Sequence, residues 1–512
     1  MNLKLMLEET VRRYGWKAGI VLGDRRLSYA ELDEASNKIA NALIKTGVSK
    51  GDRVVMLLSN SLEFIIIYFG IVKAGGIAIP LDAGYKVSEL ASLFGDCQPK
   101  VLVAESPFLE TLVPTLPRFK YIECVINLNS KYEGQFLSYR EIMATASSNR
   151  VEVGLETEDI ATISYTGGPT NHPRGVMLSH RSLVAEAIMA GDGFQQTDKD
   201  IVMLFALPLL HAFGLEAVLL ASIYKGSTVV IVPGTGLSIS NLMETIEKER
   251  GTMFLGVPYI FALAVKVAEK EGINNDLSSL RLCCSAGAPL SIDIIQRVKR
   301  HYGFTIADVW GQTEAVCHVT CPPLDGTGKL GSVGKALPEW DVKIVDDSGN
   351  ELPPNQLGEI IVRGPIMKGY YHNPQATAEV IKEGWLYTGD IGMVDEAGYL
   401  FISGRKKEMI IVKGQNIYPS DIEDVLYTHP KVAEAAVVGI PDELRGEVVR
   451  VVLRLKAGET ATEQEIRRFC LKHMANYKVP KQVIFWDSLP RTANGKISQE
   501  GLRHYLSTLS PP

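Results

Sequence analysis

Short apolar runs that each precede a longer helical stretch recur along this 512-residue chain. They lie at residues 160–165, 201–207, 228–232 and 281–284. A parallel strand can join its neighbour only through a long crossover connection, which a helix usually supplies. The alternation therefore predicts an α/β fold in which helices cover parallel sheets.

A helix near the N-terminus has the clearest boundary signals. Ser28 and Glu31 are spaced as a capping box, in which the side chain of each residue bonds the backbone N–H of the other. The apolar residues that then share one helical face are Leu32, Ala35, Ile39 and Leu43. Gly47 ends this helix, and residues 52–58 are predicted to form a buried strand.

The pattern changes beyond residue 327. Short strand-like pieces at 342–345, 359–363 and 400–403 are separated by turn signals such as DSGN at 347–350. Such pieces favour antiparallel hairpins over strand–helix–strand units.

A compact α+β segment forms the rest of the chain. The pairs Ser420–Glu423 and Thr462–Glu465 have capping-box spacing. About 110 residues suffice for a small independent domain. We therefore predict a large domain over residues 1–404, with a barrel-like part at 327–404, and a small domain over 405–512.

Composition excludes several classes of function. Lys and Arg number 53 against 59 Asp and Glu, and a net charge of −6 argues against a nucleic-acid or basic membrane-surface protein. The longest apolar run, 64–80, is interrupted by Lys73 and two glycines, so no membrane span is predicted. The N-terminus lacks the pattern of a signal peptide, and seven cysteines suit a reducing compartment. We expect a cytoplasmic protein.

The most unusual segment is SYTGGPTNHPRGV at residues 164–176. It follows a predicted strand and precedes a helix that begins near Ser179. A loop rich in Gly and Thr can direct backbone N–H groups and hydroxyls at phosphate oxygens. It lacks the spacing of a Walker P-loop. An ordinary connecting loop is the alternative interpretation.

Four further segments carry polar residues that suit phosphate chemistry. DVWGQTE at 308–314 places a carboxylate beside a hydroxyl after a strand, which suits Mg²⁺ bound to phosphate. The others are WLYTGD at 385–390, GRKKE at 404–408 and PRTANGK at 490–496. For DVWGQTE taken alone, a solvated loop with a packed Trp remains the alternative, and for PRTANGK a solvated turn.

These five segments, in this order, resemble the acyl-adenylate-forming superfamily. That superfamily includes acyl-CoA synthetases, the adenylation domains of peptide synthetases and beetle luciferases. The resemblance extends from LSYAE at 27–31 and KAGGIAIP at 73–80 to Lys496. It implies a large N-terminal domain of two helix-flanked β-sheets plus a small β-barrel, followed by a small mobile α+β C-terminal domain.

The resemblance implies an ATP site. The nucleotide-binding residues that it implies are Thr166, Gly168, Thr170, Arg174, Gly287, Ala288, Trp310, Gly311, Asp390 and Arg405. Trp310 would stack on adenine, next to the loop SAGAP at 285–289. Asp390 would bind the ribose hydroxyls, with Arg405 beside it.

The resemblance also implies the catalytic groups. Thr313 would contact the α-phosphate, and Glu314 with Thr166 would hold Mg²⁺. Lys496 would bridge the substrate carboxylate and the α-phosphate, because anionic reactants need their charge offset. His211 matches an aromatic position between the acyl site and the thiol tunnel; a core histidine is the alternative.

A second half-reaction would follow after the small domain rotates. The resemblance places the hinge at Lys407 and brings Lys413 and Gly414 to the active site for thioester formation with coenzyme A. A Gly404–Lys407 junction could permit such a rotation.

The phosphate loop departs from the usual pattern YTSGTTGxPKG. The differing residues are Gly167 for Ser, Pro169 for Thr, Asn171 for Gly and Arg174 for Lys. Two hydroxyls and one backbone donor are lost. The hypothesis that follows is an altered handling of the β- and γ-phosphates. This hypothesis is wrong if the substitutions Pro169→Thr and Arg174→Lys leave the ATP dependence unchanged.

The segment PLLHAFG at 208–214 lacks the Asp that pairs the amino group of amino-acid substrates. Apolar residues at 256–261 and at Ala315, Val316 and Val319 favour a hydrophobic acyl or aryl acid instead. The 16 residues after Lys496 leave no room for a carrier domain, and no long insertion separates the domains, so coenzyme A is the expected acceptor.

The predicted function is an ATP-dependent, AMP-forming acyl-CoA ligase for a hydrophobic monocarboxylic acid. The alternatives are an acyl-AMP ligase that loads a carrier protein and a degenerate nucleotide-binding homologue without turnover. A homodimer is compatible with the sequence. A metal site built from Cys283, Cys284, Cys317, His318 and Cys321 is disfavoured because their spacing gives no second ligand pair.

Overall fold

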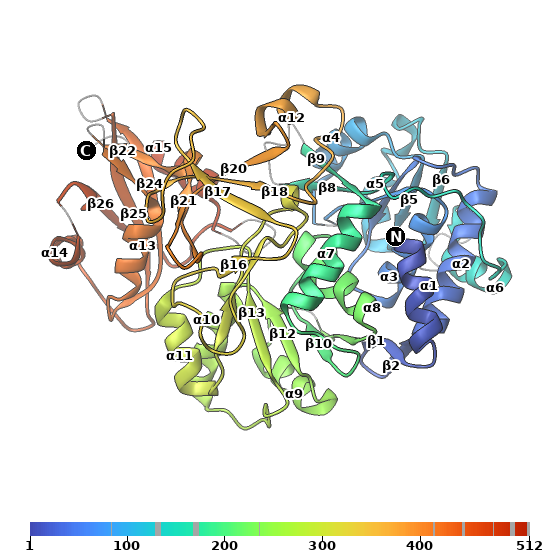
Figure 1. Ribbon diagram of the computed structural model, residues 1–512, viewed down its shortest axis with the longest axis horizontal. Helices are drawn as coiled ribbons and strands as arrows, with labels where there is room; N and C mark the ends of the chain where they lie inside the picture. Colours follow the sequence, from blue (N-terminus) through green and yellow to red (C-terminus); the bar gives the residue numbers. More distant parts are fainter. Residues whose placement is uncertain are drawn as a thin grey trace.

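The computed structural model describes residues 1–82, 84–128, 135–166, 174–234, 236–412, 415–442, 446–474, 476–491 and 497–508. In these residues, two large seven-stranded sheets are flanked by helices, as Figure 1 shows. A curled antiparallel sheet and a C-terminal α+β unit follow, and the C-terminal unit lies at the end of the molecule opposite the N-terminus (Figure 1).

The first large sheet has the order β7-β6-β5-β3-β4-β8-β9. Its strands are β3 (Arg53–Leu57), β4 (Ile77–Pro80), β5 (Val101–Ala104), β6 (Cys124–Asn127), β7 (Leu137–Ser138), β8 (Ile160–Thr166) and β9 (Arg174–Ser179). All neighbours are parallel except β8 and β9. The sequence predicted a loop up to a helix near Ser179; residues 174–179 instead form a strand, and the helix follows it.

The second large sheet has the order β14-β13-β12-β10-β11-β1-β2. Its strands are β1 (Ala18–Leu22), β2 (Arg25–Ser28), β10 (Ile201–Leu204), β11 (Thr228–Ile231), β12 (Met253–Gly256), β13 (Leu282–Ser285) and β14 (Ile306–Asp308). Only the edge strand β2 is antiparallel. The predicted alternation of strands and helices is therefore confirmed in both sheets.

Helices cover both sheets and fill the space between them. They are α1 (Leu3–Tyr14), α2 (Tyr29–Lys45), α3 (Leu62–Lys73), α4 (Val87–Cys97), α5 (Ser106–Leu112), α6 (Tyr139–Thr145), α7 (His180–Gly193), the π-helix η3 (Phe213–Leu220), α8 (Ala221–Lys225), α9 (Ile239–Glu249), α10 (Pro258–Glu271) and α11 (Ile292–Tyr302). The predicted capping box of Ser28 and Glu31 starts α2. Within the described residues, no helix is both long and apolar enough to span a membrane.

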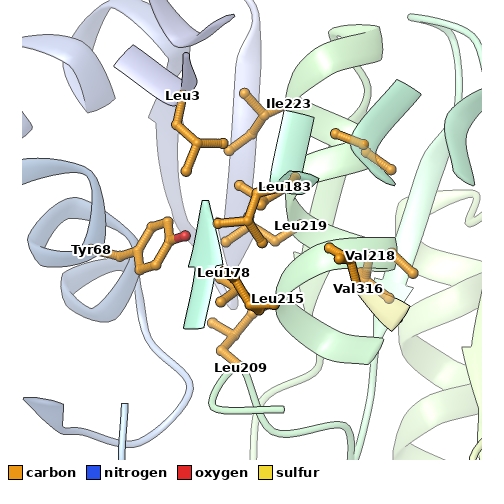
Figure 2. Packing of buried hydrophobic residues seen from close by; sticks show 14 of the residues in the cluster. Leu3, Tyr68, Leu178, Leu183, Leu209, Leu215, Val218, Leu219, Ile223 and Val316 are labelled. Carbon is orange, nitrogen blue, oxygen red and sulfur yellow. The ribbon is translucent and has the colours of Figure 1, made fainter. Parts of the chain in front are cut away.

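One continuous hydrophobic core joins the two sheets. Figure 2 shows Leu215 and Val218 of η3, Leu183 of α7 and Val316 packed together, and all four are buried. A core shared by both sheets fixes their relative position, and so fixes the loops at their edges.

The curled sheet follows, and its antiparallel pairing confirms the predicted hairpins. Its strands are β17 (Asp341–Val345), β18 (Gly358–Arg363), β19 (Ile381–Lys382), β20 (Trp385–Val394) and β21 (Leu400–Arg405), beside α12 (Pro374–Val380) and the short pair β15 (Thr320–Cys321) and β16 (Lys335–Ala336).

The C-terminal unit has its own sheet and core. Its elements are β22 (Ile410–Val412), β23 (Gln415–Ile417), α13 (Pro419–Tyr427), β24 (Val432–Asp442), β25 (Gly446–Leu455), α14 (Glu463–His473), β26 (Gln482–Phe485) and α15 (Gln499–Thr508). Thr462 caps α14 as predicted. The predicted cap at Ser420 is wrong, because α13 begins at Pro419 and the Ser420 hydroxyl donates to the Ser403 carbonyl.

Candidate active site

The strands β8 and β9 place Thr166 opposite Arg174 at the end of the first sheet. Gly168 and Thr170, together with the departures at 167, 169 and 171, lie outside the described residues. The Arg174 guanidinium lies 5.5 Å from the centre of the Tyr370 ring, a cation–π distance. Val176 of β9 forms a bridge with Tyr370. The base of the phosphate loop is thus tied to the start of the curled region.

Tyr370 joins this segment to Glu314. Its hydroxyl donates a hydrogen bond to Glu314 Oε1 over 2.9 Å. Burial and the neighbouring carboxylate raise the pKa of Tyr370, so the phenol stays protonated and remains a donor. Glu314 lies in the short 3₁₀ helix η4 (Thr313–Ala315), which Thr313 begins. The contact holds a partly exposed carboxylate beside the phosphate-loop strands.

The buried side chains of Trp310 and Asp390 and the partly exposed Arg405 form a group at the other side of this loop. Trp310 Nε1 donates to Asp390 Oδ2 over 2.9 Å, and Arg405 Nε lies 2.7 Å from Asp390 Oδ1. Asp390 and Arg405 are direct cross-strand partners of β20 and β21. Burial raises the pKa of Asp390, while Arg405 and Trp310 oppose that rise by favouring the carboxylate. Both oxygens of this carboxylate are therefore oriented by protein groups.

Two tight loops, which follow β13 and β14 of the second sheet, border the group of Trp310, Asp390 and Arg405. At Gly311 a Cβ would lie 1.7 Å from the Cys317 carbonyl oxygen, so only glycine fits there. Gly287, with φ +84°, and Ala288 follow β13, and Trp310 follows β14. The carboxyl edges of neighbouring parallel strands thus bring both loops to one end of the sheet, where ligands bind in open α/β folds.

Glu314 and Thr166 fit a magnesium site in which oxygens of the bound substrate complete the coordination shell. Among the described residues, no group of three or more His, Cys, Asp or Glu side chains could hold a metal ion. Glu314 offers a hard, partly exposed carboxylate, and Thr166 offers a hydroxyl at the end of β8. Mg²⁺ commonly takes one or two protein carboxylates and completes its shell with phosphate oxygens and water. The residues present fit that pattern.

His211 lies before the π-helix, where its carbonyl accepts from the Leu215 N–H over 2.9 Å. The side chain is partly buried. Its assignment to the boundary between acyl and thiol sites stays a prediction.

The C-terminal unit contacts α10 next to the segment that carries Lys496. Lys496, Lys413 and Gly414 lie outside the described residues, while Lys407 is exposed in η5 (Lys406–Glu408). Arg491 pairs with Ile497 across the chain, so these two residues flank the Lys496 segment. The Arg491 guanidinium lies 4.2 Å from the centre of the Tyr259 ring of α10.

Tyr370 was not among the residues that the sequence indicated, and Tyr259 appeared only as part of the apolar run 256–261. Neither lies in a phosphate-binding pattern, and both act on residues far away in the chain. Arg491 lies within the PRTANGK segment, but nothing local in that segment pointed to its contact with α10.

Comparisons with known proteins give consistent matches along the chain. Residues 7–371 match the AMP-binding enzyme family, and residues 421–496 match the AMP-binding enzyme C-terminal domain. A long-chain-fatty-acid–CoA ligase of Escherichia coli O6:H1 is 34% identical, covering 97% of this chain and 93% of the relative. An indoleacetate–CoA ligase of Aromatoleum aromaticum is 35% identical over 96% of this chain and 95% of its own length. The crystal structure of the anthranilate CoA ligase AuaEII with anthranoyl-AMP superposes with a TM-score of 0.92 at 29% identity, covering 99% and 97% of the two chains.

Proposed function

This chain belongs to the AMP-binding enzyme family as an AMP-forming acyl-CoA ligase, and we propose that it joins a hydrophobic carboxylic acid to coenzyme A through an acyl-AMP intermediate. The observation that carries the assignment of the nucleotide site is the buried carboxylate of Asp390, whose oxygens are held by Trp310 and Arg405. A fixed, buried carboxylate is a strong acceptor for two neighbouring ribose hydroxyls.

The phosphates of ATP would lie between Glu314 and the β8–β9 hairpin. Arg174 is always charged and would offset phosphate charge. Glu314 and Thr166 would hold Mg²⁺, which when bound supplies positive charge to the phosphate oxygens. The Tyr370 hydroxyl keeps the Glu314 carboxylate oriented toward that position. Gly168 and Thr170 would add backbone and hydroxyl donors.

The adenylation step needs a carboxylate to approach the α-phosphate. Thr313 would contact that phosphate, and Lys496 would lie between the two anions, where charge concentrates in the transition state. The packing of Arg491 on Tyr259 supports this placement, because it fixes one end of the Lys496 segment against α10. Positioning rather than covalent chemistry would then supply most of the rate.

The thioester step would use the other face of the C-terminal unit. We propose domains over residues 1–404 and 405–512 with a hinge at Lys407, and Lys413 and Gly414 as contacts for coenzyme A. His211 would separate the acyl site from the approaching thiol. An exposed 3₁₀ turn at Lys407, between β21 and β22, is a suitable place for a rotation.

The test is AMP release from ATP over a panel of aliphatic and aromatic acids, with and without coenzyme A. Acid-dependent AMP that requires coenzyme A and is lost in Lys496→Ala supports the proposal. A stoichiometric burst without turnover would indicate a carrier-protein thiol as acceptor. Absence of AMP with every acid, despite ATP binding, would overturn the proposal and attribute the loss to the altered phosphate loop.

A further inference from the structure

Three ionisable side chains are buried behind the loop that carries Trp310 and Glu314. Glu186 of α7 and Glu216 of η3 are 0% exposed, and His318 is 1% exposed. Within the described part of the chain, no side chain satisfies their oxygens and nitrogens, and the His318 backbone N–H approaches the Glu186 carboxyl. Among the three side chains, the nearest approach joins His318 Nδ1 and Glu186 Oε1 over 3.6 Å, which is too long for a hydrogen bond.

Burial favours the neutral form of all three groups. It raises the pKa of Glu216 to about 8 and lowers that of His318 to about 3. It also raises the pKa of Glu186, with a further contribution from the neighbouring Glu216. Buried polar groups without partners are unfavourable and rare in folded proteins. Apolar side chains of similar size would serve folding better, so this cluster calls for a functional explanation.

The cluster lies next to the loop that carries Trp310, Gly311 and Glu314. His318 follows Glu314 by four residues, and Glu216 follows His211 by five. The Cys317–His318 backbone packs against Gly311, next to Trp310. Figure 2 shows Val218 of η3 beside Val316, so the π-helix and the loop after η4 are in contact.

Cys317 marks the boundary between the cluster and the accessible surface. It is partly exposed, whereas the residue that follows it is fully buried. Burial raises the pKa of the Cys317 thiol, and both Glu186 and Glu216 add to that rise, which places the two carboxyls near it. An acid whose far end reached the Cys317 side chain would lie close to these carboxyls.

We propose that the acid substrate carries a hydrogen-bond donor, a hydroxyl or an amino group, at the end far from its carboxylate, and that Glu186, Glu216 and His318 bind this donor. The proposal rests on the proposed function and narrows its substrate class. The apolar neighbours Val316 and Val218 would contact the stem of the acid, while carboxyl oxygens and a neutral imidazole nitrogen would accept from its end.

The hydroxyl and the amine differ in what they ask of the cluster. A hydroxyl would bind while both carboxyls stay protonated. An ammonium would displace a proton, because an ion pair favours the carboxylate form. Both the hydroxyl and the amine supply a hydrogen-bond donor to the cluster, and the experiment distinguishes one from the other.

The experiment compares kcat/KM within sets of acids that differ only at the far end. Suitable sets are decanoate with its 10-hydroxy and 10-amino analogues, and phenylacetate with its 4-hydroxy and 4-aminomethyl analogues, because both alkylamines are protonated at pH 7. For wild type we expect at least one polar acid to exceed its apolar parent by ~10-fold or more, since sites built for hydrogen bonding discriminate strongly. Glu216→Leu should remove that preference. If wild type prefers the hydroxy-substituted acid, Glu216→Gln should keep that preference. If wild type prefers the amino-substituted acid, Glu216→Gln should lose it.

Folding of Glu216→Leu is favoured, because an unpaired buried carboxyl is exchanged for an apolar side chain. Glu423→Leu is the control: it removes a partly buried carboxyl, which accepts from the Val437 N–H over 2.9 Å in the C-terminal unit. We expect its substrate preference to equal that of wild type.

Two outcomes overturn the inference while leaving the ligase intact: every apolar parent is preferred by wild type, or Glu216→Leu keeps the wild-type preference. If no acid is turned over, the proposed function fails, and binding then decides the inference. Melting temperatures with each acid and AMP should rise more with a polar acid than with its parent in wild type. Equal rises would overturn it.

Discussion

Replacing Trp310 by phenylalanine isolates one hydrogen bond of the candidate site. The change keeps an aromatic ring for adenine and removes only the Nε1–H that donates to Asp390 over 2.9 Å. A hydrogen bond to a charged group contributes about 1.5–3 kcal/mol, which corresponds to about 10- to 150-fold. We therefore expect kcat/KM for ATP to fall by that factor.

The pH profile should move as well. Burial raises the pKa of Asp390, and two interactions oppose that rise: the charge of Arg405 and the hydrogen bond from Trp310. Without it, the carboxylate form is less favoured, so ATP use in Trp310→Phe should decline at a higher pH than in wild type as the medium is acidified.

The variant Trp340→Phe is the matched control. Trp340 is 6% exposed, close to the 8% of Trp310, but its indole nitrogen has no hydrogen-bond partner among the residues described. Both variants shorten a buried indole, so each should lose about 1–3 kcal/mol of unfolding free energy in urea. Only Trp310→Phe should lose kcat/KM in a pyrophosphate-release assay with varied ATP. Equal kinetic losses in the two variants, or none in Trp310→Phe, would refute the reasoning.

Three further predictions follow from single contacts. Gly311→Ala should abolish AMP release and lower the melting temperature, since its Cβ would lie 1.7 Å from the Cys317 carbonyl oxygen; wild-type activity would contradict this. Arg491→Leu should slow acid-dependent ATP–pyrophosphate exchange about fivefold, the worth of a cation–π contact with Tyr259, and Arg491→Lys should slow it less; an unchanged rate in Arg491→Leu would exclude the contact. The pKa of Glu216 rises from 4.5 to about 8 on folding, so its stabilisation is lost as pH rises through that window. Between pH 5.5 and 7 the unfolding free energy in urea should therefore fall less steeply in Glu216→Gln, by about 1.4 kcal/mol per pH unit, and equal slopes would show that this carboxyl does not titrate as stated.

Local signals predicted the architecture well because strand and helix patterns are local. The runs that became β10 and β11 are short and apolar with helices after them, which is enough to indicate parallel pairing. Ser28 and Glu31 interact within one turn, so their spacing alone identified the start of α2. At Ser420 the same spacing misled, because Pro419 begins the helix one residue earlier and Ser403 uses the hydroxyl.

The geometry of the site could be predicted only in part. Motif order placed Trp310 and Asp390 in one site, but the direct bond between them depends on how β20 passes the loop after β14. Tyr370 contacts Glu314 across 56 residues, and no local pattern encodes such a contact. The strand that begins at Arg174 is visible only through its pairing with β8 and Tyr370.

Contacts between residues far apart in the chain also carry the proposal about the acid substrate. From the sequence, Val316 and Val319 favoured a purely hydrophobic acid, and His318 appeared only as a weak metal ligand beside cysteines. Glu186 and Glu216 lie on apolar helices that any core would contain. Folding brings the Glu186 carboxyl to within 3.6 Å of the His318 ring and close to Glu216. Apolar residues can hold the stem of many acids about equally well, whereas an unpaired buried carboxyl penalises every acid that leaves it without a donor. If the proposal holds, the three polar residues that were hardest to recognise in the sequence set the substrate class.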